Sequence, residues 1–355
     1  MSTYDEIDRL IEEAIELPVE SSEAVRLYEQ AIRIADAGRD LDAVWDLRLD
    51  LINRIMHTSD WDRFFMHFAW CLTQNDRDPS RFPSDYLLWY YKWAIANGAE
   101  MPEIGKARLL GLLDDMRTRH RADGSTLRAF HAHRAWVAVR LGDLDSAKEA
   151  FSSWQDTPRD HLSDCRACEL EWEARFLVWF GETDAALELV ERIVTGPDRC
   201  VEVPRDTYGT FLLDVHRVDP ERAKRYHREG RAQIRDAPDS LRAHAGHLLY
   251  AALQRRDEEA LRIIGRHLHA ATNQPAAWQR MFFLRAVSRT CELWRERGKG
   301  AMTVTLPQPS GAPEEIRDIA QLGEWAGEAA RRLAAAFDAR NGNRTVSSWI
   351  DKWPG

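Results

Sequence analysis

The chain has 355 residues, of which 44% are apolar and 30% charged, and its net charge is −9. This length exceeds what one compact core usually holds, so it predicts several domains or one elongated array of repeats. The longest apolar runs are about five residues, whereas a membrane-spanning helix needs roughly 20, so we expect no membrane partner. The acidic N-terminus lacks an apolar signal segment, and the five cysteines are an odd number, which together favour a cytoplasmic protein without a disulfide framework.

The charge is distributed unevenly along the chain. Residues 1–100 contain 10 Lys and Arg against 20 Asp and Glu, whereas residues 205–270 contain 13 against 10. Nucleic-acid-binding proteins are typically basic over their contact surface, so this balance disfavours a nucleic acid as the partner. The two halves are instead expected to present different surfaces to other molecules.

From the N-terminus onwards, apolar residues recur three and four positions apart, as in Ile7, Leu10, Ile11, Ala14 and Ile15, which is typical of amphipathic helices. Glycine or proline interrupts this pattern every 15 to 20 residues or so, which predicts helices joined by short turns. Only residues 303–306 alternate as a strand would, and we expect no sheet. The pattern predicts helical hairpins at residues 3–37, 40–75, 84–119, 125–156, 162–196, 205–236, 239–272 and 275–340.

The turn inside the hairpins has a recurring sequence. Gly142 is followed by an acidic residue, by Ala147 and by Phe151, and a similar turn starts at Gly181. Glycine ends the first helix because it adopts a positive φ without strain, and the acidic residue caps the second helix. The small alanine of each turn, Ala147 or Ala186, is expected to be buried where the two helices cross.

Equivalent turns start at residues 142, 181, 218 and 255, spaced 39, 37 and 37 residues apart. A fixed period of about 40 residues is typical of a solenoid of stacked hairpins. The pattern Gly-x-x-x-x-Ala-x-x-x-Phe at residues 142–151, with Ala135 and Ala174 seven residues before the two glycines, resembles the tetratricopeptide repeat. The resemblance implies an all-α fold, a right-handed α-solenoid of about eight antiparallel helix hairpins. We expect helical repeats over residues 1–298, a loop rich in Gly and Pro over 299–313, and a C-terminal helix with a capping tail over 314–355.

No sequence motif for catalysis or nucleotide binding is present. The chain lacks the glycine-rich dinucleotide fingerprint, the phosphate-binding loop, the nucleophile elbow Gly-x-Ser-x-Gly and the zinc-protease motif His-Glu-x-x-His. We therefore expect a protein that is not an enzyme and that requires no cofactor.

One cluster contains residue types that bind metals: His161, Cys165, Cys168 and Cys200. Cys165 and Cys168 lie at the start of the first helix of hairpin 162–196, and Cys200 lies in the turn before the next hairpin. Successive first helices of a solenoid pack roughly 10 Å apart, so the three thiols are expected to meet. Three interpretations remain open: small buried apolar residues, a disulfide, or a structural zinc site whose fourth ligand is His161, Asp164, Glu202 or water.

A basic stripe lies on the second helix of hairpin 205–236. It consists of Lys224, Arg228, Arg231 and Arg235, and its extension is expected to include Arg242, Arg255, Arg262 and Arg266. The stripe is either a solvated face or a contact surface for an acidic partner. It lacks interleaved exposed aromatic residues on which bases would stack, which again disfavours a nucleic acid.

These expectations favour an interaction scaffold. The concave groove lined by the first helices would hold an extended or helical segment of another protein or a peptide, with Tyr91 and Lys92 pointing into the groove as contact residues. The alternative is a regulatory receptor that takes a small peptide or effector into the same groove.

Overall fold

The computed structural model describes residues 3–18, 21–56, 60–235, 237, 240–273, 276–306 and 315–353. Within this part of the chain there are 18 helices and two short strands, so the predicted all-helical fold class is confirmed. The expectation of no sheet is wrong, because Thr303–Leu306 (β1) pairs antiparallel with Glu315–Asp318 (β2). The loop expected at 299–313 is thus partly strand, and residues 307–314 lie outside the described residues.

The helices of the first half are α1 Thr3–Glu16, α2 Ser22–Ala37, α3 Leu41–Ile55, α4 Trp61–Arg77, α5 Asp85–Ala99, α6 Lys106–Asp123, α7 Arg128–Arg140, α8 Leu144–Asp156, α9 Arg166–Phe180 and α10 Thr183–Thr195. Those of the second half are α11 Arg205–Thr210, α12 Leu212–Val218, α13 Pro220–Ile234, α14 Leu241–Leu253, α15 Asp257–Asn273, α16 Ala277–Glu296, α17 Ile319–Asn341 and α18 Thr345–Lys352. Each predicted hairpin coincides with a pair of these helices, except that the first helix of the sixth hairpin is interrupted at Phe211.

Capping residues explain where the helices start and end. Gly142 and Gly181 adopt positive φ angles of 76° and 86° after the first helices of their pairs, as predicted, and Arg255 adopts 59° in the equivalent turn that lacks a glycine. Several second helices start at an aspartate whose carboxylate accepts a hydrogen bond from the backbone N–H three residues later. These aspartates are Asp60, Asp143 and Asp219.

Small residues allow the paired helices to pack closely. Ala147 and Ala186 have no exposed surface, which confirms their predicted burial, and Ala135 and Ala174 on the facing helices are equally buried. Two large apolar clusters form the core, one running from α1 to α9 and the other from α14 to α18. A smaller cluster lies between them along α9 to α14.

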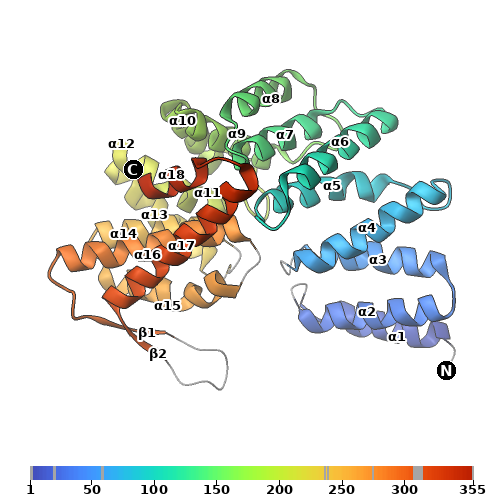
Figure 1. Cartoon of the computed structure of the whole chain (residues 1–355), viewed down its shortest axis with the longest axis horizontal. Helices are drawn as coiled ribbons and strands as arrows, with labels where there is room; N and C mark the ends of the chain where they lie inside the picture. The colour runs from blue at the N-terminus through green and yellow to red at the C-terminus, as the bar shows by residue number, and fades with distance from the viewer. Residues whose placement is uncertain are drawn as a thin grey trace.

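The end of the chain folds back onto the middle of the array (Figure 1). The Arg340 guanidinium at the end of α17 donates hydrogen bonds to the carbonyl oxygens of Ala99 and Arg140, at 2.9 and 3.1 Å. Asn341 Nδ2 also donates to the Arg140 carbonyl, at 2.8 Å. Trp349 of α18 packs against both large apolar clusters. These contacts satisfy carbonyl groups left free where α5 and α7 end. They join segments 200 or more positions apart in sequence, so the curved array closes upon itself.

Candidate functional site: a central cavity

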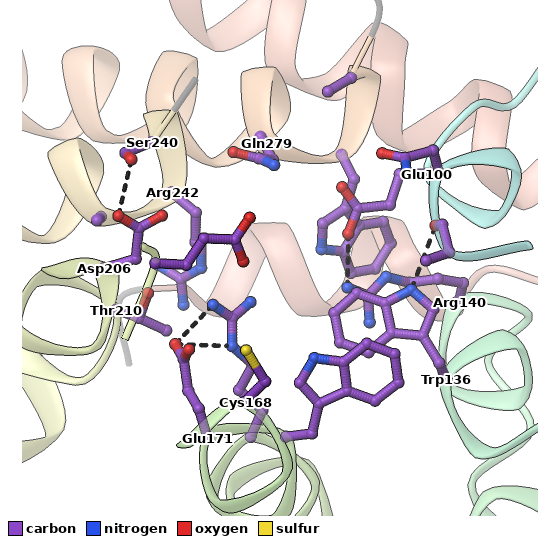
Figure 2. Close-up of a pocket in the computed structure, with 18 of the residues that line it drawn as sticks. Glu100, Trp136, Arg140, Cys168, Glu171, Asp206, Thr210, Ser240, Arg242 and Gln279 are labelled. Carbon is purple, nitrogen blue, oxygen red and sulfur yellow. Dashed lines mark hydrogen bonds and ion pairs between the residues drawn. The ribbon is translucent and has the colours of Figure 1, made fainter. Parts of the chain in front are cut away.

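A cavity of about 290 Å³ lies on the inner side of the array (Figure 2). Its walls come from the first helices of successive pairs, α5, α7, α9, α11 and α14, and from α16. This is the inner face that the sequence predicts as a concave groove, and α16 forms one side of it. The inner face therefore holds a cavity that is walled on several sides and partly open to solvent.

Tryptophans form one wall of the cavity around a buried arginine. The Arg140 guanidinium carbon lies 3.6 Å from the ring centroid of Trp136 and 4.6 Å from those of Trp179 and Trp278. Its Nη2 also pairs with Glu100 Oε1 at 2.7 Å, and the side chain is only 1% exposed. Burial lowers the pKa of Arg140 to about 10, so the group stays positive at neutral pH. Arg140 thus holds the wall together by cation–π contacts and an ion pair.

The opposite wall carries acidic side chains that are already paired. Glu171 accepts a hydrogen bond from Arg175 Nη2 at 2.8 Å. Asp206 accepts hydrogen bonds from Ser240 Oγ and from Arg205 Nε, each at 2.8 Å. These contacts fix the shape of the wall and leave its paired carboxylates with little capacity for a ligand.

Glu202 is the acidic residue of this wall whose side chain makes no hydrogen bond or ion pair within the described part of the chain; its backbone carbonyl accepts a hydrogen bond from Asp206 N at 2.8 Å. Glu202 is exposed on the cavity side, but partial desolvation of its carboxyl group, together with the nearby carboxylates of Asp206 and Glu171, raises the pKa of Glu202. Arg205 and Arg175 offset this effect only in part. Among the described residues the cavity therefore has one carboxyl group without a side-chain partner, in the wall opposite the tryptophans, and this combination suits an organic cation.

The residues predicted to contact a partner in the groove belong to the core instead. Tyr91 is fully buried and its hydroxyl bonds to Asp115, so the prediction that it is open to a partner is wrong. Lys92 does line the cavity, but its ammonium donates to the Leu162 carbonyl at 2.9 Å and pairs with Asp164 at 2.8 Å. Both residues lie on the inner helix α5, where two neighbouring helix pairs bury most positions.

The structure brings the three predicted cysteines together. The Sγ atoms of Cys165, Cys168 and Cys200 all lie within 4.8 Å of one another, and Cys168 also lines the cavity. His161 is not part of this cluster: its imidazole is 65% exposed and lies 3.3 Å from Asp123, so its prediction as the fourth metal ligand is wrong. All five cysteines of the chain are free thiols.

The basic stripe forms one side of a second, outer groove of about 670 Å³ between α13 and α15. Arg228, Arg231 and Arg235 face Arg262 and Arg266 across it. Lys224, predicted as part of the stripe, does not line this groove and lies 4.0 Å from Glu221. Of the predicted extension, Arg255 lies outside the groove, and Arg242 lines the central cavity and stacks on the Phe282 ring at 4.3 Å.

Sequence reasoning did not identify the charged residues that build the cavity. Arg140, Glu171, Arg175 and Arg205 interrupt the apolar pattern of the inner helices, and this interruption is the signal that could have revealed them. Which of them pair with each other depends on the packing of helices that are distant in sequence. Glu202 was considered only as a metal ligand.

Neither a protein-family model, nor a curated protein, nor a solved structure matches this chain. Every helix in the described residues is too short or too polar to span a lipid bilayer. The fold and the site thus define a class, an array of helix pairs that encloses a cavity with aromatic and charged walls, and the function has to be inferred from that cavity.

Proposed function

We propose that the chain is a small-molecule receptor, built as a right-handed solenoid similar to tetratricopeptide-repeat proteins. The coincidence of the predicted hairpins with observed helix pairs, together with the buried alanines at their crossings, supports the repeat architecture. The ligand enters the central cavity and carries a protonated amine next to an aromatic or apolar group. This is a regulatory receptor rather than a scaffold that holds an extended segment.

The closure of the array favours the receptor over the scaffold. A segment of another protein needs an open groove along several helix pairs. Arg340 and Asn341 bind the end of the chain to the ends of α5 and α7 and leave these helix ends covered. A volume of about 290 Å³ is at the lower end of the range for small-molecule sites, roughly 300–1,000 Å³.

The observation that carries the proposal is the Glu202 carboxyl group, which lines the same cavity as the tryptophan wall and whose side chain has no partner among the described residues. A carboxylate attracts an ammonium group, and the faces of Trp172 and Trp179 would contact the apolar part of the ligand. The remaining carboxylates of the cavity hold cationic side chains of the protein, as Glu100 holds Arg140. We therefore expect the cavity to bind one amine, at Glu202.

The test compares ligands of the same shape and different charge. Tryptamine is expected to change the tryptophan fluorescence of the protein saturably and to raise its melting temperature, because its amine pairs with Glu202 while its ring packs on the wall. Indole-3-propionate, with a carboxylate in place of the amine, is expected to bind at least about tenfold more weakly, which corresponds to about 1.4 kcal/mol. Equal affinity for the two compounds, or no saturable binding of tryptamine, would contradict the proposal.

The outer basic groove supports a second candidate function, docking of an acidic segment of another protein. Six arginines line it, and Glu259 is the acidic residue among the residues that line it. Arg231 Nε and Arg256 Nη1 each lie 3.7 Å from a carboxylate oxygen of Glu259, so this single carboxylate pairs with more than one arginine. The excess positive charge attracts carboxylates.

An oligoglutamate peptide labelled with a fluorophore serves as the probe for this second function. Reversing two groove charges, with Arg228→Glu and Arg235→Glu, is expected to abolish most of its binding at low salt. Lys224→Glu, on the same helix but outside the groove, is the matched control and should have a much smaller effect. Equal losses for the two variants would show that only net charge matters and would refute the docking site. Tighter binding of single-stranded RNA than of the peptide would also refute it.

A further inference from the structure

The three clustered cysteines lie where two helix pairs meet. Cys165 is the N-cap of α9, Cys168 is in its first turn, and Cys200 is in the turn that joins α10 to α11. Cys168 Sγ and Cys200 Sγ are 3.4 Å apart, and no separation among the three sulfur atoms exceeds 4.8 Å. A tetrahedral zinc ion with Zn–S bonds of about 2.3 Å places its sulfur ligands about 3.8 Å apart. The sulfur positions therefore suit a common ion.

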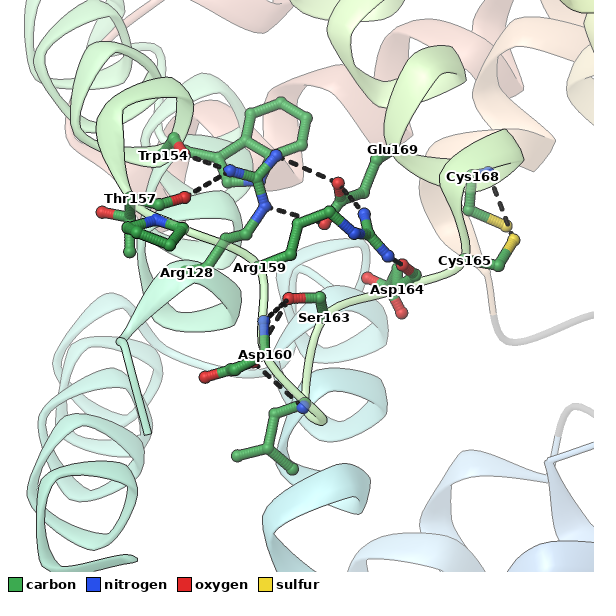
Figure 3. Close-up of polar contacts among 12 residues, drawn as sticks. Arg128, Trp154, Thr157, Arg159, Asp160, Ser163, Asp164, Cys165, Cys168 and Glu169 are labelled. Carbon is green, nitrogen blue, oxygen red and sulfur yellow. Dashed lines mark hydrogen bonds and ion pairs between the residues drawn. The ribbon is translucent and has the colours of Figure 1, made fainter. Parts of the chain in front are cut away.

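Backbone N–H groups point at two of the sulfur atoms. Cys168 N donates to Cys165 Sγ at 3.4 Å, and Figure 3 shows this contact at the start of α9. Val203 N donates to Cys200 Sγ at 3.4 Å, while Cys200 N donates to the Val203 carbonyl at 2.9 Å and closes the turn. Such donors orient the sulfur atoms and would hydrogen-bond to them as metal-bound thiolates, which is the support that a metal ligand requires.

The loop before Cys165 is held in place by a polar network (Figure 3). Arg128 pairs with Glu169 at 3.0 Å and donates to the Trp154 carbonyl at 2.8 Å. Arg159 also pairs with Glu169 and donates to the Asp164 carbonyl at 2.5 Å. These contacts fix the loop on both sides of its bend, so Cys165 is presented to the other two thiols without the cost of ordering a flexible segment.

The other two cysteines of the chain pack as buried apolar side chains and serve as a comparison. Cys71 and Cys291 are at most 1% exposed, and each packs in a large apolar cluster without a second thiol beside it. In the cluster, by contrast, Cys165 is exposed and its two neighbours are half-buried. Burial alone therefore does not explain why three thiols gather at this partly open position.

We propose that Cys165, Cys168 and Cys200 bind a zinc ion through three thiolates. No carboxylate or imidazole of the described residues belongs to the group, so the fourth position is open to a water molecule. Binding forms three Zn–S bonds and releases the thiol protons to solvent. The ion joins α9 to the turn before α11, and Cys168 places it at the wall of the central cavity. This inference does not depend on whether the cavity binds an amine.

Metal content of the purified protein tests the site. The protein is prepared with a cleavable tag that binds no metal, in a reducing buffer without chelator, and zinc is measured by mass spectrometry. The wild type is expected to carry equimolar zinc, and Cys165→Ser, Cys168→Ser and Cys200→Ser only traces. Cys71→Ala removes a lone core thiol and should keep the zinc.

Cobalt substitution keeps the proposal testable if the serine variants fail to fold. Adding Co²⁺ to metal-free wild-type protein is expected to give thiolate-to-cobalt charge-transfer absorption and the visible bands of a tetrahedral site. The ion should also protect the three thiols from alkylation under native conditions. Trace zinc in the wild type together with no cobalt absorption would overturn the proposal. A Cys168–Cys200 disulfide under the same reducing conditions, detected as the loss of two hydrogen masses, would overturn it as well.

Discussion

At the scale of single residues, the cavity depends on charges that are buried but paired. Arg140 is enclosed by three indole rings and neutralised by Glu100, whose side chain is 9% exposed. Removing one member of such a pair leaves the other charge buried without a partner, which costs more than the pair contributes. Arg140 is therefore a position where one substitution should affect the whole cavity.

We expect Arg140→Ala to lower the free energy of unfolding by about 3–5 kcal/mol, because Glu100 loses its partner and the tryptophans lose their cation. The double variant Arg140→Met with Glu100→Gln removes both charges and should recover a large part of this loss. Urea denaturation monitored by circular dichroism measures both values. A loss below about 1 kcal/mol for Arg140→Ala would show that the ion pair is not buried as described.

Buried histidines predict a dependence of stability on pH. Burial lowers the pKa of His133 and of His67 to about 4, below the usual value of about 6.5 in an unfolded chain. Between these values the unfolded state takes up protons that the folded state does not, so stability is lost as the pH falls through this window and is unaffected above it. The loss is at most about 3 kcal/mol for each histidine.

Thermal unfolding between pH 8 and pH 4.5 or so checks this prediction. The melting temperature should be level above pH 7 and fall below about pH 6.5. His133→Gln is expected to make the fall shallower, because His67 still contributes, whereas His161→Gln replaces an exposed imidazole and should leave the profile unchanged. A profile that is level down to about pH 4.5 would mean that neither buried histidine resists protonation.

At the scale of elements, the two recurring glycine turns differ in what packs against them. A Cβ atom added at Gly181 would meet no other atom within 4 Å, so alanine there causes only backbone strain. A Cβ atom at Gly142 would lie 2.7 Å from Thr345 Cβ and 3.1 Å from Asn343 Nδ2, both in the segment that folds back. The two turns share a backbone conformation and differ in whether the end of the chain covers them.

This difference yields a matched pair of variants. Gly181→Ala is expected to lower the free energy of unfolding by about 1–2 kcal/mol, because alanine is strained at positive φ. Gly142→Ala carries the same strain and also displaces α18, so its loss should be larger by at least about 1 kcal/mol. Chemical denaturation of both variants gives the comparison. Equal losses would indicate that α18 does not cover the Gly142 turn.

At the scale of the whole molecule, the helix pairs could be predicted from the sequence and the closure could not. Turns such as Gly142 and Asp143 are local signals, and the burial of Ala147 follows from the turn itself. Closure depends on Arg340 and Asn341 reaching carbonyl groups about 200 residues away, and no periodic pattern records such contacts. The inner groove predicted from the helix pairs therefore appears in the structure as a partly open cavity with α16 as an additional wall.

The candidate sites divide in the same way. The meeting of Cys165, Cys168 and Cys200 follows from the helix-pair geometry and could be predicted. The position of His161 could not be predicted from its closeness to Cys165 in sequence. The bend between the two residues turns the His161 side chain toward Asp123 instead. Strand β2 was missed because its sequence, Glu315–Asp318, alternates too weakly to be recognised without its partner strand β1.

The central claim, that Glu202 makes the central cavity a receptor for an organic amine, is tested most directly by tryptamine titrations of two matched variants. Glu202→Gln removes the uncommitted carboxyl group, and Glu188→Gln removes an exposed one on α10 that does not line the cavity. The account predicts that Glu202→Gln weakens tryptamine binding by at least about tenfold, or about 1.4 kcal/mol, while Glu188→Gln binds as the wild type does. Unchanged affinity in Glu202→Gln, measured by fluorescence on folded protein, would contradict it.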